Sequence, residues 1–275
     1  MSSINDSKTA ILSTVINFEL YGKSAQLFPK NTKKYVIDGT NGMHGLQSIF
    51  YMMKKLRGKG IEWLVMADED VLFQNSELVS EIIQKMEKEH YTVCGVRDGG
   101  LLSHRNYNPF LINTFFSIIN FKEIESIWDK KQLVKNDFIF DNEFDDDIKE
   151  LKGTYDVKSL YEPYYVFYLW LRRKNKRFLF LDSDHPFEED QISNTVYFEN
   201  KVLLHHTWFA RAYGTNEKHT KRIDGIFDLL NFENNIEVNP VIFKDKWYYW
   251  SAKVRKWFRR MMRRLRIKQK EERIK

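Results

Sequence analysis

The stretch WLVMADEDVLF, residues 63–73, decides the fold of this 275-residue sequence. An apolar run rich in residues that favour strands breaks off into Asp68, Glu69 and Asp70 and then resumes. Three carboxylates at the edge of a buried strand repel one another and lose hydration. The pattern therefore predicts a strand that ends at a site where something compensates the negative charge.

Segments on both sides of this stretch alternate between strand-like and helix-like patterns. The sequence predicts strands at 9–17, 33–38, 61–67 and 91–96, and helices at 43–57 and 75–90. Strands that alternate with helices are typical of a parallel sheet covered by helices. We therefore expect an α/β fold with a mainly parallel central sheet flanked by helices.

Polar residues follow each of the predicted strands. Asn17, Asp38, the acidic triplet and Asp98 all fall at predicted strand ends. In open α/β sheets, ligands bind beyond the carboxyl ends of the strands. These residues are therefore expected to face a common site.

The second half of the chain is harder to read. A helix followed by a strand is predicted over 162–184, and a hairpin or strand over 195–214 that contains His205 and His206. The acidic segment 136–150 is predicted to be a solvated loop. No Pro/Gly-rich linker separates the halves, so we expect one compact body.

Composition narrows the class of protein. With 43% hydrophobic and 15% aromatic residues, the chain can bury a substantial core. A single cysteine, Cys94, cannot form an internal disulfide, which fits a reducing compartment. Because the sequence shows neither a signal peptide nor an apolar run long enough to span a bilayer, we expect a cytoplasmic protein.

The positive charge is concentrated near the C-terminus. Residues 253–270 carry ten Lys and Arg and no acid, so removing their +10 from the net +6 leaves −4 for the remainder. Because the charge lies in one terminal segment, no DNA partner is expected.

The same segment has an apolar face. Trp247, Trp250, Val254, Trp257 and Met261 recur at spacings of three and four, which predicts a basic amphipathic helix over 243–275. Such a helix suits an anionic membrane surface, contacted through residues 247–270 at the inner face of the cell membrane. An RNA, a calmodulin-like partner, or packing on the protein's own body are alternatives.

The acidic triplet has the chemistry of a cation site. Side chains two apart on a strand point the same way, so Asp68 and Asp70 can face one ligand while Glu69 points elsewhere. Mn²⁺ or Mg²⁺ suits two converging carboxylates and would relieve their repulsion. A loop with solvated acids is the alternative.

The order of strands, helices and acids resembles the glycosyltransferases of the GT-A fold, specifically the family 2 type. The resemblance covers residues 8–100 well and the rest loosely. It implies a catalytic domain over 1–242, with a nucleotide-sugar-binding half (8–100) and an acceptor-binding half (101–242). The implied activity is metal-dependent sugar transfer, with inversion, from a nucleotide-diphosphate donor to a glycan or lipid-linked acceptor of a bacterial-type cell-surface polysaccharide or lipopolysaccharide.

The resemblance also implies roles for individual residues. Asp38 would contact the base or ribose of the donor, while Asp68 and Asp70 would hold the metal that bridges the diphosphate. Glu162 would deprotonate the acceptor hydroxyl, although Pro163 stands where the family has an aspartate. The acidic loop is the reserve for this base, through Asp141, Glu143 and Asp145 to Asp147.

Other candidates lie near the predicted strand ends. His206 is expected to complete the metal site or to contact the diphosphate; His205 is less favoured because neighbours on a strand point to opposite faces. Arg211 could pair with a phosphate through its forked donors. Asp98 and Gly99 could approach the sugar. Asn17, at the end of the first strand, joins these expected substrate-binding residues.

Two further classes of function fit parts of the pattern. A nucleotidyltransferase that makes sugar nucleotides also joins an α/β sheet to metal-binding carboxylates, but it usually has a Gly-rich basic loop after the first strand, which residues 16–26 lack. The other is a non-catalytic membrane- or RNA-binding protein on a transferase-like scaffold.

Overall fold

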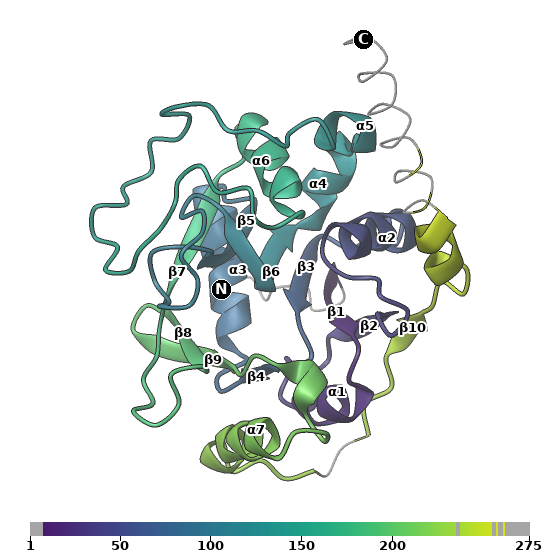
Figure 1. The fold of residues 1–275 in the computed structure, drawn as a ribbon, viewed down its shortest axis with the longest axis vertical. Coiled ribbons are helices and arrows are strands. Elements are labelled where there is room, and N and C mark those ends of the chain that lie inside the picture. The colour runs from purple at the N-terminus through teal and green to yellow at the C-terminus, as the bar shows by residue number, and fades with distance from the viewer. Residues whose placement is uncertain (1–7, 235–236, 255–256, 258–260, 262–275) are drawn as a thin grey trace, which may run out of the picture.

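The computed structural model describes residues 8–234, 237–254, 257 and 261, which form a mixed sheet with helices on both faces (Figure 1). The strand order is β10-β2-β1-β3-β6-β5-β7-β8-β9-β4. The strands are β1 (Thr9–Val15), β2 (Lys33–Asp38), β3 (Trp63–Ala67), β4 (Val71–Phe73), β5 (Val93–Arg97), β6 (Ile112–Asn120), β7 (Phe178–Asp184), β8 (Asn194–Phe198), β9 (Lys201–His206) and β10 (Val241–Phe243). The helices are α1 (Phe18–Ser24), α2 (Leu46–Leu56), α3 (Leu78–Glu89), α4 (Phe121–Ile127), α5 (Lys130–Leu133), α6 (Tyr165–Arg173) and α7 (Glu217–Leu229), with a 3₁₀ turn η2 at Ala210–Ala212. The predicted α/β fold is confirmed.

The first three strands form one parallel part of the sheet, and β5 pairs in parallel with β7 in another. β1 pairs in parallel with both β2 and β3, and β10 extends this part beyond β2. β1 is buried along almost its whole length, as expected of a strand with helices on both faces. Val15 pairs with Asp38, the last residue of β2, so Asp38 lies at the same edge of the sheet as Asn17 and Asp68, which follow β1 and β3.

The position of β6 was not predicted. This antiparallel strand lies between β3 and β5, and Ala67 pairs with Phe116. Its sequence, INTFFSIIN, is apolar on both faces, so it has no period that separates a strand from a buried helix. Because β6 runs opposite to β3, its first residues lie beside the acidic triplet.

Helices cover the two faces of the sheet in separate groups. The core on one face joins the sheet to α2, α4 and α6, and the core on the other joins it to α3 and part of α1. α6 is buried on nearly every side, from Tyr165 to Leu171. The helix and strand predicted over 162–184 are therefore confirmed as α6 and β7, and residues 136–150 form a loop, as predicted.

The C-terminal half adds a hairpin and an outer strand. β8 and β9 form a hairpin, one of the two alternatives predicted over 195–214, and it ends at His206. β9 pairs with the short strand β4 so that Val71 lies opposite His206. Residues 248–254 are helical, whereas most of the basic residues of 253–270 lie outside the described residues. Among the described residues, no helix is both long and apolar enough to span a bilayer.

Cys94 provides a test of the core. It is fully buried on β5 between β6 and β7, and burial raises the pKa of its thiol. We expect Ellman's reagent to react with the native protein at least about a thousandfold more slowly than with the protein in concentrated urea, because reaction needs opening of the core. Rapid native labelling at one thiol per chain would contradict this placement of β5.

Candidate functional site

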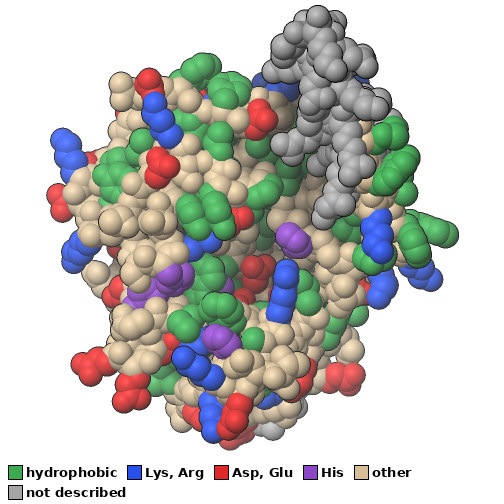
Figure 2. All heavy atoms as spheres, viewed as in Figure 1, with side chains coloured by type: hydrophobic (Ala, Val, Ile, Leu, Met, Phe, Trp, Pro, Cys, Tyr) green, Lys and Arg blue, Asp and Glu red, His purple; other side chains and the backbone are tan. Residues whose placement is uncertain are grey.

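A cavity of about 460 Å³ lies at the edge where β1 and β3 end and β6 begins. It is lined by parts of five segments, 12–16, 44–49, 66–70, 113–115 and 206–212. Figure 2 shows a hollow in this face of the molecule with acidic side chains at its floor. Four of the site residues predicted from the sequence line this cavity: Asp68, Asp70, His206 and Arg211. The described lining residues do not include the other five, which are Asn17, Asp38, Asp98, Gly99 and Glu162.

Asp68 and Asp70 come directly after β3. The backbone amide of Asp68 donates to the carbonyl of Phe115 at 2.9 Å, and the carbonyl of Asp70 accepts from the amide of Thr207 at 3.0 Å. Burial, and then the charges of Glu69 and Asp70, raise the pKa of Asp68 well above its ordinary value. The three acids therefore crowd one another, as the sequence suggested.

Glu69 is engaged with the end of β1. Its carboxylate accepts from the backbone amides of Ile16 at 3.0 Å and Asn17 at 3.3 Å. Burial and the charge of Asp70 raise the pKa of Glu69 to about 7, although these amides oppose the shift. Glu69 therefore fixes the turn that follows β1. It also lines the cavity together with Asp68 and Asp70, so the expectation that it points elsewhere was wrong.

The paired histidines have different surroundings. His206 is buried, its Nε2 lies 3.4 Å from Oδ1 of Asp70, and its ring stacks on Phe115 with centroids 4.0 Å apart. His205 instead contacts Thr195 and Gln74, and burial lowers its pKa to about 4. Only His206 of this pair lines the cavity, because alternate residues of β9 face opposite sides.

The segment after His206 has an unusual backbone. Trp208 and Phe209 both have positive φ, at 57° and 58°, a conformation that costs energy in bulky residues. This turn leads into η2, which carries the exposed Arg211 to the cavity wall. Strain held beside a cavity is common at functional sites.

Asn17 holds this segment in place. Its Nδ2 donates to the carbonyls of Ala210 at 3.0 Å and Tyr213 at 2.9 Å, on the two sides of Arg211. Its Oδ1 accepts from the amide of Leu20 and caps α1. The side chain of Asn17 therefore bonds to the protein itself, and it holds the backbone on both sides of Arg211.

Asp38 is paired with the C-terminal part of the chain. Nζ of Lys244 lies 2.6 Å from its carboxylate, and the amide of Thr40 donates to it at 3.0 Å. Burial raises the pKa of Asp38, but the hydrogen bonds from Lys244 and Thr40 outweigh burial and hold the pKa below its ordinary value. A ligand that reaches Asp38 would therefore compete with Lys244.

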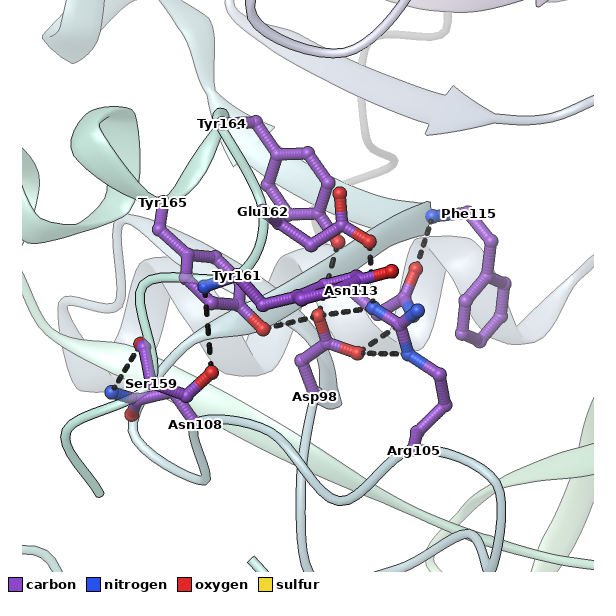
Figure 3. A network of polar contacts seen from close by, with 10 residues as sticks. All are labelled: Asp98, Arg105, Asn108, Asn113, Phe115, Ser159, Tyr161, Glu162, Tyr164 and Tyr165. Carbon is purple, nitrogen blue, oxygen red and sulfur yellow. Dashed lines mark hydrogen bonds and ion pairs between the residues drawn. The ribbon is translucent and has the colours of Figure 1, made fainter. Parts of the chain in front are cut away.

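Asp98 lies at the centre of a buried polar network (Figure 3). Arg105 donates to both of its carboxylate oxygens, at 2.7 and 2.6 Å. Asn113 and the hydroxyls of Tyr164 and Tyr165 donate at 2.8, 3.0 and 2.6 Å. Because Asp98 is fully buried and has these donors, a sugar hydroxyl could contact it only by displacing them.

The network also reaches Glu162. Nη2 of Arg105 donates to Oε1 of Glu162 at 3.1 Å, and the side chain of Glu162 is mostly buried (Figure 3). Burial lowers the pKa of Arg105, but the hydrogen bonds and charge of Asp98 outweigh burial and raise the pKa above its ordinary value. Arg105 is therefore a fixed cation between two carboxylates.

The close approach at Gly99 is made by the protein itself. A Cβ at this position would lie 2.1 Å from the carbonyl oxygen of Tyr107, so a glycine is needed there.

In the acidic loop, Glu143 pairs with Arg173 and Asp146 pairs with Arg172. Among the described residues, no acid of this loop lines the cavity.

The donor set of the cavity fits a divalent cation. Carboxylate oxygens and an imidazole nitrogen are ligands that Mn²⁺ accepts, and a cation would relieve the crowding of Asp68 and Asp70. Nδ1 of His206 is buried with no hydrogen-bond partner in the described part of the chain. No group of three or more His, Cys, Asp or Glu among the described residues could hold an ion alone. Remaining ligands would come from water and substrate, as is usual for Mg²⁺.

Several cavity residues were not predicted from the sequence. His44, Gly45 and Ser48 come from the start of α2, and Asn113 and Phe115 come from the start of β6. Gly45 has φ of 54°, and the clustered glycines and asparagine of residues 39–45 were the sequence signal for a turn here. The residues of β6 gave no such signal.

Comparisons with known proteins give partial likenesses of fold. No protein-family model and no curated protein sequence matches this chain. A mannosyltransferase from Pyrobaculum calidifontis, solved with GDP-Man and Mn²⁺, matches 43% of this chain and 46% of its own at 9% identity, with a TM-score of 0.28. A glycosyltransferase involved in glycosylation of the major capsid of PBCV-1 matches 43% of this chain and 63% of its own at 18% identity, with a TM-score of 0.32. Mouse xyloside xylosyltransferase 1, in its apo form, matches 63% of this chain and 85% of its own at 8% identity, with a TM-score of 0.36.

The chain spans less than half of the mannosyltransferase and less than two thirds of the capsid glycosyltransferase. These likenesses are similarities of fold over part of each chain and do not assign the protein to a family. Membership of the family 2 type stays a prediction from the sequence.

Proposed function

We propose that the protein is a metal-dependent glycosyltransferase that uses a nucleotide-diphosphate sugar. One observation carries the proposal: Asp68 and Asp70, at the end of β3, line the same cavity as His206 and Arg211 from the far end of the chain. Carboxylates for a cation and a guanidinium for phosphate in one cavity suit a nucleotide diphosphate. The cavity is also within the size range of small-molecule sites.

The four predicted residues that line the cavity each have a proposed role. Asp68 and Asp70 hold Mn²⁺ or Mg²⁺, and His206 supplies a further ligand or contacts the diphosphate. When bound, such an ion supplies Lewis-acid chemistry that neutralises a departing diphosphate. Arg211 pairs with a phosphate oxygen and remains exposed enough to reach a ligand from solvent.

Glu162 is the proposed general base for the acceptor hydroxyl. Arg105 binds its Oε1, so Oε2 is the oxygen that would take the proton.

Asp38 is proposed to contact the base or ribose of the donor once Lys244 moves aside. Contacts of Asn17, Asp98 and Gly99 with the substrate stay predictions. In the structure, the side chains of Asn17 and Asp98 form hydrogen bonds within the protein, and Gly99 lies against the backbone of Tyr107.

The acceptor proposed is a glycan or lipid-linked glycan in bacterial-type cell-surface polysaccharide or lipopolysaccharide synthesis at the cytoplasmic face of a membrane. Inversion at the anomeric carbon is part of the same proposal. Both parts rest on the resemblance of the sequence to GT-A glycosyltransferases.

A thermal-shift panel tests the proposal. UDP, GDP and ADP are each added with and without Mn²⁺, and we expect one of them to raise the unfolding midpoint only when Mn²⁺ is present. At a hundred times the dissociation constant, the ligand adds about 2.7 kcal/mol to the free energy of unfolding, or about 5 °C or more in midpoint. Absence of any Mn²⁺-dependent shift across the panel would contradict a nucleotide-diphosphate site.

A further inference from the structure

The C-terminal segment, which is helical over residues 248–254 and begins with a turn at Trp247, leaves an apolar stripe exposed. Trp247, Trp250, Val254 and Trp257 recur at spacings of three and four, and they are 76%, 61%, 60% and 62% exposed. Three tryptophans on one face are unusual on a protein surface, because each leaves a large apolar area in water. These four side chains therefore do not pack on the described part of the protein, whereas Met261, which the sequence places on the same stripe, is half-buried.

The opposite side of the segment already faces the body. Tyr248 packs against the larger core, and Ser251 and Ala252 are half-buried. The root of the helix is tied to the sheet, since β10 pairs with β2 and Phe243 stacks on Tyr35 with centroids 5.6 Å apart. The outward direction of the tryptophans is therefore set by contacts on the inner side.

Positive charge borders the stripe. Nζ of Lys253 lies 4.3 Å from the ring centroid of Tyr249 and 5.6 Å from that of Trp250. In the sequence, residues 253–270 carry a charge of +10 against −4 for the remainder. Figure 2 shows hydrophobic and basic side chains together at the edge where Figure 1 places this segment.

We propose that the stripe of Trp247, Trp250, Val254 and Trp257 is a surface that inserts into the interface of an anionic lipid bilayer. Tryptophan favours the boundary between headgroups and acyl chains, and Lys and Arg beside it are attracted to anionic lipids. Val254 in the stripe gains nothing by stacking on RNA bases but gains by burial in lipid. A second copy would bring two tails of +10 together, and their repulsion opposes self-association.

Vesicle co-sedimentation of the full chain tests this surface. Vesicles of phosphatidylcholine alone are compared with vesicles that also contain phosphatidylglycerol, at low and high salt. We expect strong binding only to the anionic vesicles, and about tenfold or greater loss of binding in the triple variant Trp247→Ala, Trp250→Ala, Trp257→Ala. The three side chains are mostly exposed, so the unfolding midpoint of the variant should stay close to that of the parent chain.

Phe140→Ala is the matched control, because Phe140 is an aromatic residue 63% exposed in the acidic loop, and it should leave vesicle binding unchanged. Equal binding of the parent and the triple variant would overturn the proposal, as would equal binding to neutral and anionic vesicles. A concentration-dependent dimer that the triple variant abolishes would assign the stripe to a second copy instead, and tighter binding to RNA than to vesicles would assign it to RNA. None of these readouts requires the transferase proposal to be correct.

Discussion

Asp70→Asn is expected to lower release of the nucleoside diphosphate from sugar nucleotides by on the order of a hundredfold to a thousandfold. Asparagine keeps the shape of the side chain but removes a charged ligand of the proposed cation. The backbone carbonyl that accepts from Thr207 is unaffected, so the link between β4 and the segment after β9 should persist. The Mn²⁺-dependent shift in unfolding midpoint should disappear together with the activity.

The same substitution should not destabilise the fold in the absence of metal. Burial and the charges of Glu69 and Asp70 raise the pKa of Asp68, so loss of the charge at Asp70 removes a repulsion. We therefore expect the metal-free variant to unfold at the same temperature as the parent chain or higher. This combination of lost activity and undiminished stability distinguishes a functional carboxylate from a structural one.

Asp137→Asn is the control, because it removes the same charge from an exposed position in the loop after α5. It should leave both turnover and the Mn²⁺ response unchanged. Activity measured by release of UDP, GDP or ADP from the matching sugar nucleotides checks both variants. Full turnover by Asp70→Asn would exclude a metal role for Asp70 and remove the main support for the proposed function.

The parallel half of the fold could be predicted because its signals are local. β1, β2 and β3 end at turn or acidic residues, and the helices between them have an apolar period that a single sequence shows. β6 could not be placed because a strand apolar on both faces has no period. β4 is only three residues long, and its pairing with β9 depends on a hairpin more than a hundred residues away in the sequence.

The candidate site divides in the same way. Asp68 and Asp70 were predictable from the strand that precedes them, and the separation of His206 from His205 followed from strand alternation. The partners of Asp38 and Asp98 were not predictable, because Lys244 and Tyr164 are brought to them only by tertiary folding. A polar residue at a strand end can face a ligand or be satisfied by the protein, and local sequence does not distinguish the two cases.

Asp98→Ala is expected to have the largest effect on stability, lowering the free energy of unfolding by about 3–5 kcal/mol. Removal of the carboxylate leaves the buried guanidinium of Arg105 with Glu162 as its one charged partner among the described residues. The hydroxyls of Tyr164 and Tyr165 lose their acceptor as well, and unsatisfied buried donors are costly. By contrast, Glu62→Ala breaks exposed pairs with Lys8 and Lys122 and should cost no more than about 1 kcal/mol.

The double variant Asp98→Ala, Arg105→Met separates the cost of the stranded charge from the cost of the lost packing. If the uncompensated guanidinium dominates, methionine in place of Arg105 should recover part of the loss, so that the double variant is more stable than Asp98→Ala alone. Urea unfolding of the parent chain, both single variants and the double variant gives the coupling directly. Strictly additive losses would mean that Asp98 stabilises the fold through its tyrosine and asparagine partners and that Arg105 finds another partner when the carboxylate is removed.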